Sequence, residues 1–344
     1  MATRQNPRGD AIRRFILDIV DDHPSDVAHV TAKRFGITRQ AVSRHLRQLT
    51  SDELLTAQGS TRSRRYAPRV IEEWVESYPI TAELTEDRPW RDRVAASLAD
   101  LSQNALGICQ YGFTEMFNNA IEHSEGAKIG VSLKRTATTT ELMVWDDGVG
   151  IFEKIQKALG LLDVRHSLLE LAKGKFTTDP VHHTGEGVFF TSRMFDKFWI
   201  MSGDLYFTHS ADSPYDWLLD DERGRPGTAI FMKLNHATRR TTVKVFDQYA
   251  SGDDYGFTKT VVPVTLAAFG DDNLVSRSQA RRMLARVDRF STVMLDFTGV
   301  DALGQAFADE VFRVFANEHP EVELVDVHTN SAVKRMIARA KAAG

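Results

Sequence analysis

Polar side chains recur on one face of an otherwise apolar segment at residues 104–124, which its apolar spacing predicts to be a helix. Glu115, Asn119 and then Glu122 or His123 follow at intervals of four, seven and eight residues, so an α-helix places them on the same side. A carboxylate, an amide and an imidazole can bind cations or move protons. Isolated polar residues on such a helix would usually be solvated, so their meaning depends on the segments that follow.

Glycine-rich turns follow this helix. Residues 127–134 and 140–145 have the pattern of paired strands, and they lead into a sharp turn at 146–150, Asp-Asp-Gly-Val-Gly. Residues 183–190 are again glycine-rich and open a helix, and a further strand is expected at 228–234. Either turn alone carries little information. Their order, with a helix before them and strands between them, indicates one composite site.

This order of motifs resembles the GHKL family of ATPases, which includes sensor histidine kinases, anti-sigma-factor serine kinases, gyrase-type topoisomerases and chaperone ATPases. The resemblance covers about residues 90–236. Glu-x-x-x-Asn-Ala resembles the N box of the family, and Asp-x-Gly-x-Gly and Gly-x-Gly resemble its two glycine boxes. A late Gly-Thr pair resembles the strand beside the adenine. The matching positions are Glu115 and Asn119, then Asp146, Gly148 and Gly150, then Gly185 and Gly187, and finally Thr228.

The resemblance implies that these residues bind ATP and Mg²⁺. Asn119 would offer an uncharged oxygen to Mg²⁺, which keeps several waters while it bridges phosphates. Asp146 would accept a hydrogen bond from the adenine amino group, a contact that the keto oxygen of guanine could not make. Gly148 and Gly150 would let the backbone turn close to the base.

The phosphate end of the implied site contains the second glycine box. Gly185 and Gly187 would expose amides at a helix N-terminus, which is a ready cradle for phosphate. Glu115, one turn before Asn119, is placed to orient or deprotonate a nucleophile near the γ-phosphate. Glu115 could instead be a surface charge, and His123 could be a helix-end histidine or a neighbour of the metal site.

Residues 151–184 separate the glycine boxes and are too long for a plain connection, so we expect a lid. They contain a predicted helix at 167–172, followed by Lys173 and Lys175. Either lysine could reach the phosphates once the lid closes, or both could belong to a solvated basic loop.

The resemblance to the GHKL family also implies a fold for this domain, namely an α/β sandwich with a mixed, mostly antiparallel sheet and helices on one face.

Within the GHKL family, the N box resembles that of the anti-sigma serine kinases more than that of the sensor histidine kinases. It reads Ala-Ile-Glu-His after Asn119. No upstream helical hairpin carries a phosphoacceptor histidine, so a sensor histidine kinase is a poor match. Topoisomerase and mismatch-repair ATPases continue into a transducer domain, whereas the segment downstream here is of a different kind.

The formal net charge of −4 argues by itself against a nucleic-acid partner, but the charge is unevenly distributed. Residues 1–70 contain 13 Lys and Arg against 7 Asp and Glu, whereas the remainder contains 30 against 40. This basic head on an acidic body suggests a module that contacts nucleic acid. Its pattern predicts three short helices, the second capped by Ser25 and ended by Gly36 and the third capped by Thr38, and then a basic hairpin.

The head resembles a winged helix-turn-helix, on the segment at 35–49, FGITRQAVSRHLRQL, and the hairpin after it. Val42, Leu46 and Leu49 are expected to face inward. The resemblance implies that the third helix enters the DNA major groove and that arginines of the wing neutralise phosphates. The alternative is a basic bundle for protein contacts or dimerisation, and a homodimer is the prior expectation. The predicted DNA contacts are Thr38, Arg39, Gln40, Ser43, Arg44 and Arg47 in the helix and Arg62, Arg64 and Arg65 in the wing.

Residues 258–344 alternate strands and helices, which implies an open α/β layer. The segment VMLDFTGVDALGQAFADEVF resembles STAS and STAS-like domains, the partner fold of the anti-sigma kinases. Antagonists of that family are phosphorylated on a Ser at the start of the next helix, where this chain has Gly304, Gln305 and Ala306. A STAS-like domain without that hydroxyl would be a docking or regulatory part for a protein partner. We expect strands at 259–265, 292–297 and 321–327 and helices at 276–290, 304–317 and 331–342.

Composition sets the remaining expectations. A length of 344 residues suggests two or three domains, and 42% apolar with 26% charged residues is ordinary for a soluble globular chain. Cys109 is the only cysteine, which excludes an internal disulfide and a cysteine-based zinc site and fits a reducing cytoplasm. The start lacks the apolar core of a signal peptide, and no stretch approaches ~18 apolar residues, so no membrane segment is expected.

The sequence therefore predicts a winged helix-turn-helix at 1–70, a linker at 71–89, a GHKL domain at 90–240 and a STAS-like domain at 255–344. The leading hypothesis is a DNA-binding transcription regulator that Mg·ATP switches through different affinities for two conformations, with slow hydrolysis. The alternative is a serine/threonine protein kinase of the anti-sigma type that acts on a separate partner. A structural interaction protein with a degenerate nucleotide site ranks last.

Overall fold

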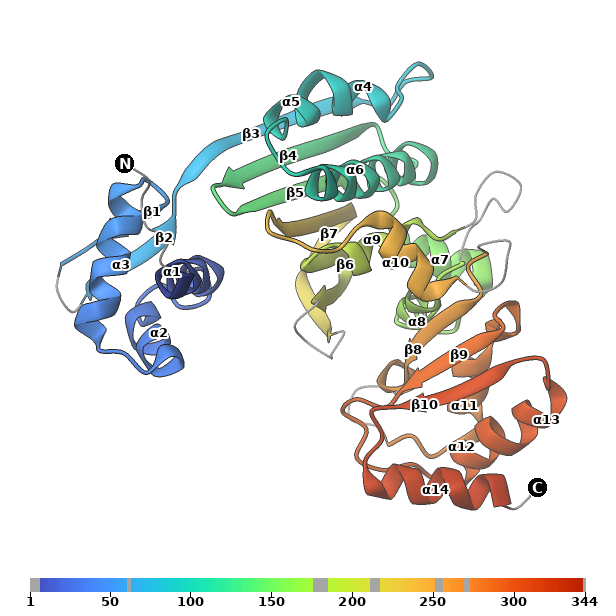
Figure 1. Cartoon of the computed structure of the whole chain (residues 1–344). Coiled ribbons are helices and arrows are strands. Elements are labelled where there is room, and N and C mark those ends of the chain that lie inside the picture. The colour runs from blue at the N-terminus through green and yellow to red at the C-terminus, as the bar shows by residue number, and fades with distance from the viewer. Residues whose placement is uncertain are drawn as a thin grey trace. The chain divides into compact units, whose positions relative to one another are not determined.

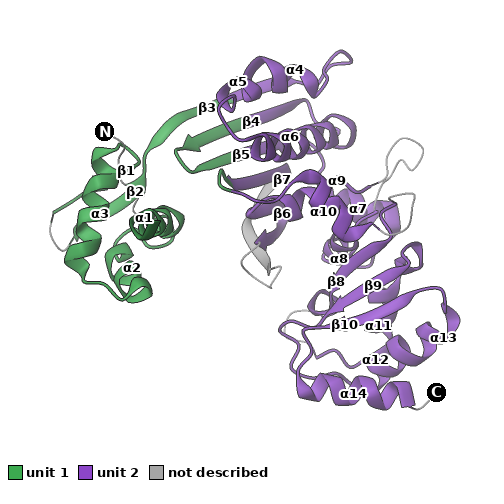
Figure 2. Cartoon of the chain, viewed as in Figure 1, with its two compact units in different colours: residues 1–75, 132–141, 235–237 green, residues 76–131, 142–234, 238–344 purple. Residues whose placement is uncertain are grey.

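The computed structural model describes six stretches of the chain, residues 7–60, 63–175, 185–210, 217–250, 256–268 and 273–342. They belong to two compact units (Figure 2), which consist of residues 1–75, 132–141 and 235–237 and of residues 76–131, 142–234 and 238–344. Within the second unit, we call residues 256–342 the C-terminal domain.

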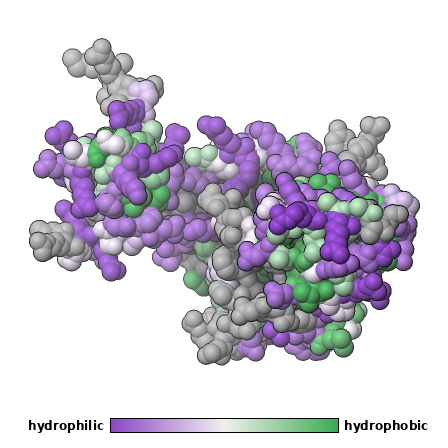
Figure 3. All heavy atoms as spheres, turned by 90° about the horizontal axis from the view of Figure 1, so that it is seen from below, coloured by the Kyte–Doolittle hydropathy of each residue, from purple (hydrophilic) through white to green (hydrophobic). Residues whose placement is uncertain are grey.

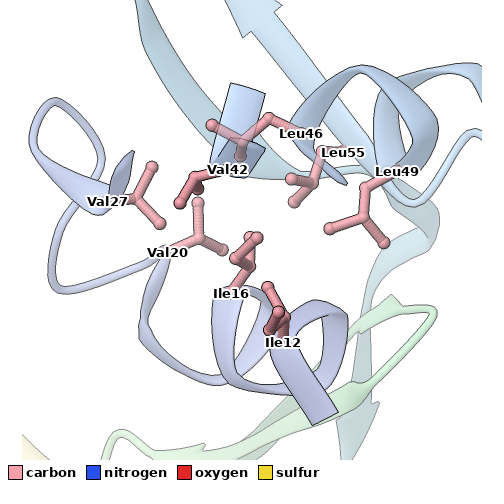
Figure 4. Packing of buried hydrophobic residues seen from close by; sticks show 8 residues of the cluster. All are labelled: Ile12, Ile16, Val20, Val27, Val42, Leu46, Leu49 and Leu55. Atoms are coloured by element: carbon pink, nitrogen blue, oxygen red, sulfur yellow. The ribbon is translucent and has the colours of Figure 1, made fainter. Parts of the chain in front are cut away.

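The head of the chain consists of three helices and an antiparallel two-stranded hairpin (Figure 1), which are α1 (Pro7–Ile19), α2 (Val27–Phe35), α3 (Arg39–Ser51), β1 (Leu55–Gln58) and β2 (Arg65–Pro68). The three side chains of α3 that were expected to face inward are buried together with side chains from the other helices and from β1 (Figure 4). This core contains Ile12, Ile16, Val20, Val27, Val42, Leu46, Leu49 and Leu55. The predicted order of elements is confirmed, whereas the winged-helix identity of the head stays a prediction.

Two of the three predicted helix ends in the head are confirmed. Thr38 caps α3, with its hydroxyl accepting a backbone amide at 3.2 Å, and Gly36 ends α2 with a left-handed φ of +60°. The prediction that Ser25 caps α2 is wrong. Asp26 takes the cap position without a side-chain cap bond, since its carboxylate lies 3.1 Å from the imidazole of His23.

A five-stranded sheet with the order β3-β4-β5-β7-β6 follows the head, formed by β3 (Val70–Pro79), β4 (Lys128–Thr136), β5 (Thr139–Asp146), β6 (Lys197–Ser210) and β7 (Trp217–Asn235). β6 and β7 are antiparallel, and the two-residue connection between β4 and β5 allows only an antiparallel pair. The linker predicted at 71–89 is therefore wrong in its first part, because β3 adds to the sheet as an edge strand. After β3 come α4 (Asp87–Pro89), a π-helical turn (Trp90–Val94) and α5 (Ala95–Ser97).

Two helices lie over one face of this sheet (Figure 1), α6 (Gln103–His123) and α9 (Gly187–Met194), and they pack against each other and against α10 (Thr242–Tyr249). The long helix predicted at 104–124 is thus confirmed as α6, and its apolar side chains Phe113 and Phe117 are fully buried. Along β6, Phe198 and Ile200 are buried while their neighbours are more exposed, as expected of a sheet that is covered on one face.

The described part of the segment between the two glycine motifs, residues 151–175, contains two helices. They are α7 (Ile151–Leu159) and α8 (His166–Lys173), and the second confirms the helix predicted at 167–172. Residues 176–184 lie outside the described part of the chain.

The C-terminal domain alternates strands and helices, as predicted. Its parallel strands, in the order β10-β9-β8, are β8 (Lys259–Pro263), β9 (Thr292–Asp296) and β10 (Glu323–Val327). The helices are α11 (Arg277–Leu284), α12 (Gln305–Asp309), which continues through a π-helical turn (Glu310–Phe315) into α13 (Ala316–Glu318), and α14 (Ser331–Ala342). The helix predicted at 276–290 is wrong beyond Leu284, because Arg286 adopts a left-handed φ of +62° and a 3-10 turn (Val287–Arg289) follows it.

None of the helices in the described stretches is long and apolar enough to cross a membrane. Hydrophilic residues cover most of the face of the molecule seen in Figure 3, where hydrophobic residues appear in small groups.

Replacing Leu46 by Ala should destabilise the head. Leu46 is 1% exposed in the core of the head, and truncation of a buried leucine costs ~2–5 kcal/mol. Hydrogen exchange of the α3 amides, measured on the intact chain by mass spectrometry, should accelerate about tenfold or more. Gln40→Ala, on the exposed side of the same helix, is the control and should change stability by no more than ~0.5 kcal/mol. Equal exchange in the two variants would contradict the core described above.

Candidate functional site

A cavity of about 340 Å³ is lined by residues of α6, β5, α7, α8, α9 and β7 and of the loops beside them. It brings together most of the residues that the sequence singled out, from segments more than a hundred positions apart. They are Glu115, Asn119, Asp146, Gly150, Gly185, Gly187 and Thr228. The remaining three predicted ligand-binding residues, Gly148, Lys173 and Lys175, do not line it.

Asp146, at the end of β5, is a buried carboxylate of this cavity, with 8% of its surface exposed. Its Oδ1 accepts hydrogen bonds from the amides of Gly148 at 2.9 Å and Thr228 at 3.3 Å. Burial raises the pKa of Asp146, and the two amide donors offset part of that rise. Within the described residues no donor is bound to Oδ2, so this oxygen can accept a hydrogen bond from a ligand.

Thr228 holds the same corner of the cavity from β7. Its hydroxyl accepts the first amide of α7 at 2.9 Å. Gly227 before it has a φ of +80°, and a Cβ there would overlap the backbone oxygen of Asp146, so the position requires glycine. Gly148 is packed as tightly, because its Cβ would overlap the backbone oxygen of Ser124 at the end of α6. Gly148 thus shapes the cavity without lining it.

The first turn of α9 forms a second wall together with α6. Glu115 lies against this turn, since a Cβ at Gly187 would overlap its carboxylate. Glu186, immediately before α9, also lines the cavity. Burial raises the pKa of Tyr111 far above its usual value, and the negative charges of Glu115 and Glu186 raise it further. The wall therefore combines two carboxylates with the first-turn amides of α9, which have no partner within the helix.

Asn119 lines the cavity one turn after Glu115. An amide oxygen with a neighbouring carboxylate suits Mg²⁺, which takes few protein ligands and completes its shell with water and phosphate. In the stretches that the structure describes, no cluster of three or more His, Cys, Asp or Glu residues could hold a metal ion by itself. The donor set therefore fits a cation that enters together with a phosphate ligand.

Sequence reasoning missed Lys154, which is the only lysine or arginine that lines the cavity within the described residues. Its ammonium donates to the carbonyl of His123 at 2.7 Å and to the carboxylate of Glu125 at 2.9 Å. A cation is favourable there because the carbonyls at the end of α6 carry partial negative charge. His123 both ends α6 and lines the cavity. The available signal for Lys154 was its place one turn after Gly150, the residue that caps α7.

Apolar side chains complete the cavity, so that part of it can hold a flat, apolar group. They include Met116, Val144, Ile155, Leu171, Phe189 and Ile230.

The two lysines predicted to reach the phosphates lie elsewhere. Lys173 is 2% exposed, and its ammonium donates to Glu170 at 2.9 Å and to two backbone carbonyls of the C-terminal domain at 3.2 and 2.8 Å. Lys175 donates to the Arg289 carbonyl at 3.1 Å. The structure brings neither lysine to the cavity, because the C-terminal domain packs on α8 and takes up these donors.

The residues predicted to contact DNA lie on α3 and in the hairpin. Thr38 and Ser43 use their hydroxyls locally, as the cap of α3 and as a donor to the Arg39 carbonyl at 2.9 Å. Arg62 lies outside the described residues. The other predicted contacts are exposed, namely Arg39, Gln40, Arg44, Arg47, Arg64 and Arg65. Their contact with DNA stays a prediction.

Two segments of the chain match known protein families. Residues 80–204 match the histidine kinase-like ATPase domain, and residues 279–334 match a STAS-like domain of unknown function. No curated protein matches the chain. The chain therefore contains a histidine kinase-like ATPase domain and, after it, a STAS-like domain. Both resemblances drawn from the sequence are confirmed at this level.

Replacing Asp146 by Asn should change which base the cavity accepts. The amide keeps an oxygen for the amides of Gly148 and Thr228, but it presents a donor where the carboxylate presented an acceptor. We expect ATP affinity to fall about 10- to 100-fold, because an unmatched buried polar contact costs ~1–3 kcal/mol. GTP binding should not fall, because the keto oxygen of guanine can accept from the new amide. Fluorescence titration with labelled ATP and GTP measures both.

Thermal unfolding of the ligand-free variant is the control for this substitution. Burial raises the pKa of Asp146 in the folded chain, so its carboxyl favours folding when protonated at low pH and loses that benefit as the pH rises through the raised pKa. At neutral pH the neutral amide should therefore not lower the melting temperature. A folded variant with unchanged ATP affinity would contradict the assignment of Asp146.

Proposed function

We propose that this protein is a DNA-binding regulator whose ATPase domain binds Mg·ATP as a switch. One observation carries the nucleotide part: a single cavity unites Glu115, Asn119, Asp146 and Thr228 with the glycines around the first turn of α9. Glu115 supplies a carboxylate that can act as a general base or orient water, and Asn119 supplies a cation ligand. Asp146 supplies an acceptor for the adenine amino group, and the amides of the first turn of α9 can bind phosphate.

Asp146 selects the base in this proposal. Two amides occupy its Oδ1, which fixes the carboxylate and leaves Oδ2 as an acceptor for the adenine amino group. Guanine would bring its keto oxygen against the same carboxylate, and two acceptors repel. Val144, Ile155 and Ile230 surround the base and keep water from competing for this hydrogen bond.

The first turn of α9 binds phosphate, because helix N-termini carry partial positive charge and free amides. Asn119 would hold Mg²⁺, and the bound cation would neutralise part of the negative charge on the phosphate oxygens. Glu115 lies against the same turn, where it can orient an attacking water or take its proton. Such an arrangement supports slow hydrolysis of ATP.

The basic head binds DNA in this proposal. Its core fixes α3, and exposed Arg39, Gln40, Arg44 and Arg47 present the donors that read base edges and phosphates. Arg64 and Arg65 on the hairpin add phosphate contacts. ATP acts as a switch only if it has different affinities for two conformations of the chain.

Electrophoretic mobility shift with a pool of random duplex DNA, with and without Mg·ATP, tests the proposal. We expect Mg·ATP to change DNA affinity about fivefold or more, which is the usual lower range of a coupling between two sites. Asn119→Ala is the matched control, because it should bind DNA without a response to Mg·ATP. Identical DNA affinity with and without Mg·ATP would contradict the proposed control of DNA binding by ATP. Absence of DNA binding would contradict the proposed DNA-binding function of the head.

A second candidate function is a serine/threonine protein kinase of the anti-sigma type. The position of Glu115 favours it, because the same carboxylate could deprotonate a protein hydroxyl instead of water. The start of α12 carries Gly304, Gln305 and Ala306 and therefore no hydroxyl, so the phosphate acceptor has to be a separate protein. Incubation with γ-labelled ATP and candidate partners discriminates: label on protein supports the kinase, and free phosphate alone supports the ATP-switched regulator.

A further inference from the structure

Helix α8 belongs both to the wall of the cavity and to the contact with the C-terminal domain. Leu171 of α8 lines the cavity. The same helix packs on β8 and on the 3-10 turn Val264–Ala267 of the C-terminal domain. Thr260 of β8 is fully buried, and its hydroxyl donates to the Lys173 carbonyl at 2.6 Å. The position of this cavity wall therefore depends on the C-terminal domain.

A buried ion cluster holds this contact together. Lys173 and Glu170 lie 2.9 Å apart and are 2% and 6% exposed. Arg286 of the C-terminal domain donates to the second oxygen of Glu170 at 2.7 Å through Nη2 and at 3.0 Å through Nε. The ammonium of Lys173 also donates to the backbone carbonyls of Arg282 and Ala285. Besides each other, both buried charges thus have partners in the C-terminal domain, and losing a partner of a buried charge is costly.

Aromatic rings form a second connection between the cavity and the C-terminal domain. Phe189, in the first turn of α9, lines the cavity, and its ring lies 4.7 Å from that of Phe257. Phe257 in turn lies 5.2 Å from Phe290. Gly174, at the end of α8, has a φ of +76°, and a Cβ there would come within 2.9 Å of Phe257 and 3.1 Å of Phe189. The end of α8 is thus packed directly against both rings.

We propose that the STAS-like C-terminal domain sets the nucleotide affinity of the cavity, with Glu170, Lys173 and Arg286 as the positioning residues that couple the two. The inference rests on the nucleotide site proposed above and adds how nucleotide binding at that site is regulated. Leu171 and Phe189 keep their places at the cavity only while the C-terminal domain holds α8 and packs its Phe257 against Phe189. By linkage, a partner that binds the C-terminal domain and loosens this contact lowers nucleotide affinity, and nucleotide lowers the affinity of that partner by the same factor.

Arg286→Gln tests the coupling, with Arg281→Gln as a matched control. Both arginines pair with a glutamate whose side chain is 7% exposed, but the partner of Arg281, Glu310 at 2.6 Å, lies within the C-terminal domain itself. Calorimetric titration with a non-hydrolysable ATP analogue and Mg²⁺ should show binding about 5- to 50-fold weaker in Arg286→Gln. In Arg281→Gln the affinity should stay within about twofold of the original chain. Arg286→Lys, which keeps the cation, should recover most of the loss.

Hydrogen exchange measures the coupling separately, because a contact with a purely structural role would not make the exchange rates of the C-terminal domain respond to nucleotide. Adding the ATP analogue to the original chain should slow exchange at residues 282–290, and this response should be absent in Arg286→Gln. Lys175→Gln is a second, milder variant, because it removes the half-buried ammonium that donates to the Arg289 carbonyl and leaves the bond from Arg289 to the Lys175 backbone carbonyl in place. It should weaken binding about 2- to 5-fold if Arg286→Gln does not fold.

The inference is overturned if a folded Arg286→Gln, or Lys175→Gln in its place, binds the analogue within about twofold of the original chain. A chain that binds no nucleotide even with its natural sequence would instead overturn the proposed function. The two failures are therefore distinguishable in the same titration.

Discussion

The buried carboxylate of Asp146 is the constraint on which the ATPase domain depends. A carboxylate with so little exposed surface needs donors, and it takes them from the amides of Gly148 and Thr228. These two bonds bring the end of β5, the turn that leads into α7, and β7 to one point. Gly227 has to be a glycine there because its backbone passes directly over Asp146. The cavity is the space that remains beside this junction, so in the proposed function the recognition of a base follows from how the fold satisfies one buried acid.

Much of this site could be predicted from sequence because its signals are local. The spacing of Glu115 and Asn119 is a property of one helix, and each glycine turn contains a glycine with a positive φ, Gly150 at +94° and Gly185 at +73°. Thr38 and Gly36 were predictable for the same reason, since caps depend on neighbouring amides and carbonyls. In all these cases the physical cause lies within a few residues of the signal.

The positions that the sequence did not predict correctly depend on contacts with residues far away in the chain. Lys173 reads as a lid lysine because nothing nearby shows that the carbonyls of Arg282 and Ala285 will surround it. β3 reads as a linker because, as an edge strand, it keeps Ile71 and Val75 exposed and lacks the clean alternation of a half-buried strand. The left-handed turn at Arg286 interrupts an apparently continuous helix, and its side chain reaches Glu170 of the ATPase domain. Tertiary packing, rather than local preference, decides each of these positions.

These distant contacts also change what the STAS-like domain means for the protein. A domain tethered by a loop would act only through its own partners, whereas this one shares a buried ion cluster with the wall of the cavity. Both proposals therefore require that the cavity bind an adenine nucleotide. Isothermal titration of the unmodified chain with a non-hydrolysable ATP analogue, with and without Mg²⁺, tests this most directly. We expect saturable binding at one site per chain that strengthens with Mg²⁺, and an absence of binding heat at millimolar analogue in both conditions would contradict nucleotide binding at the cavity.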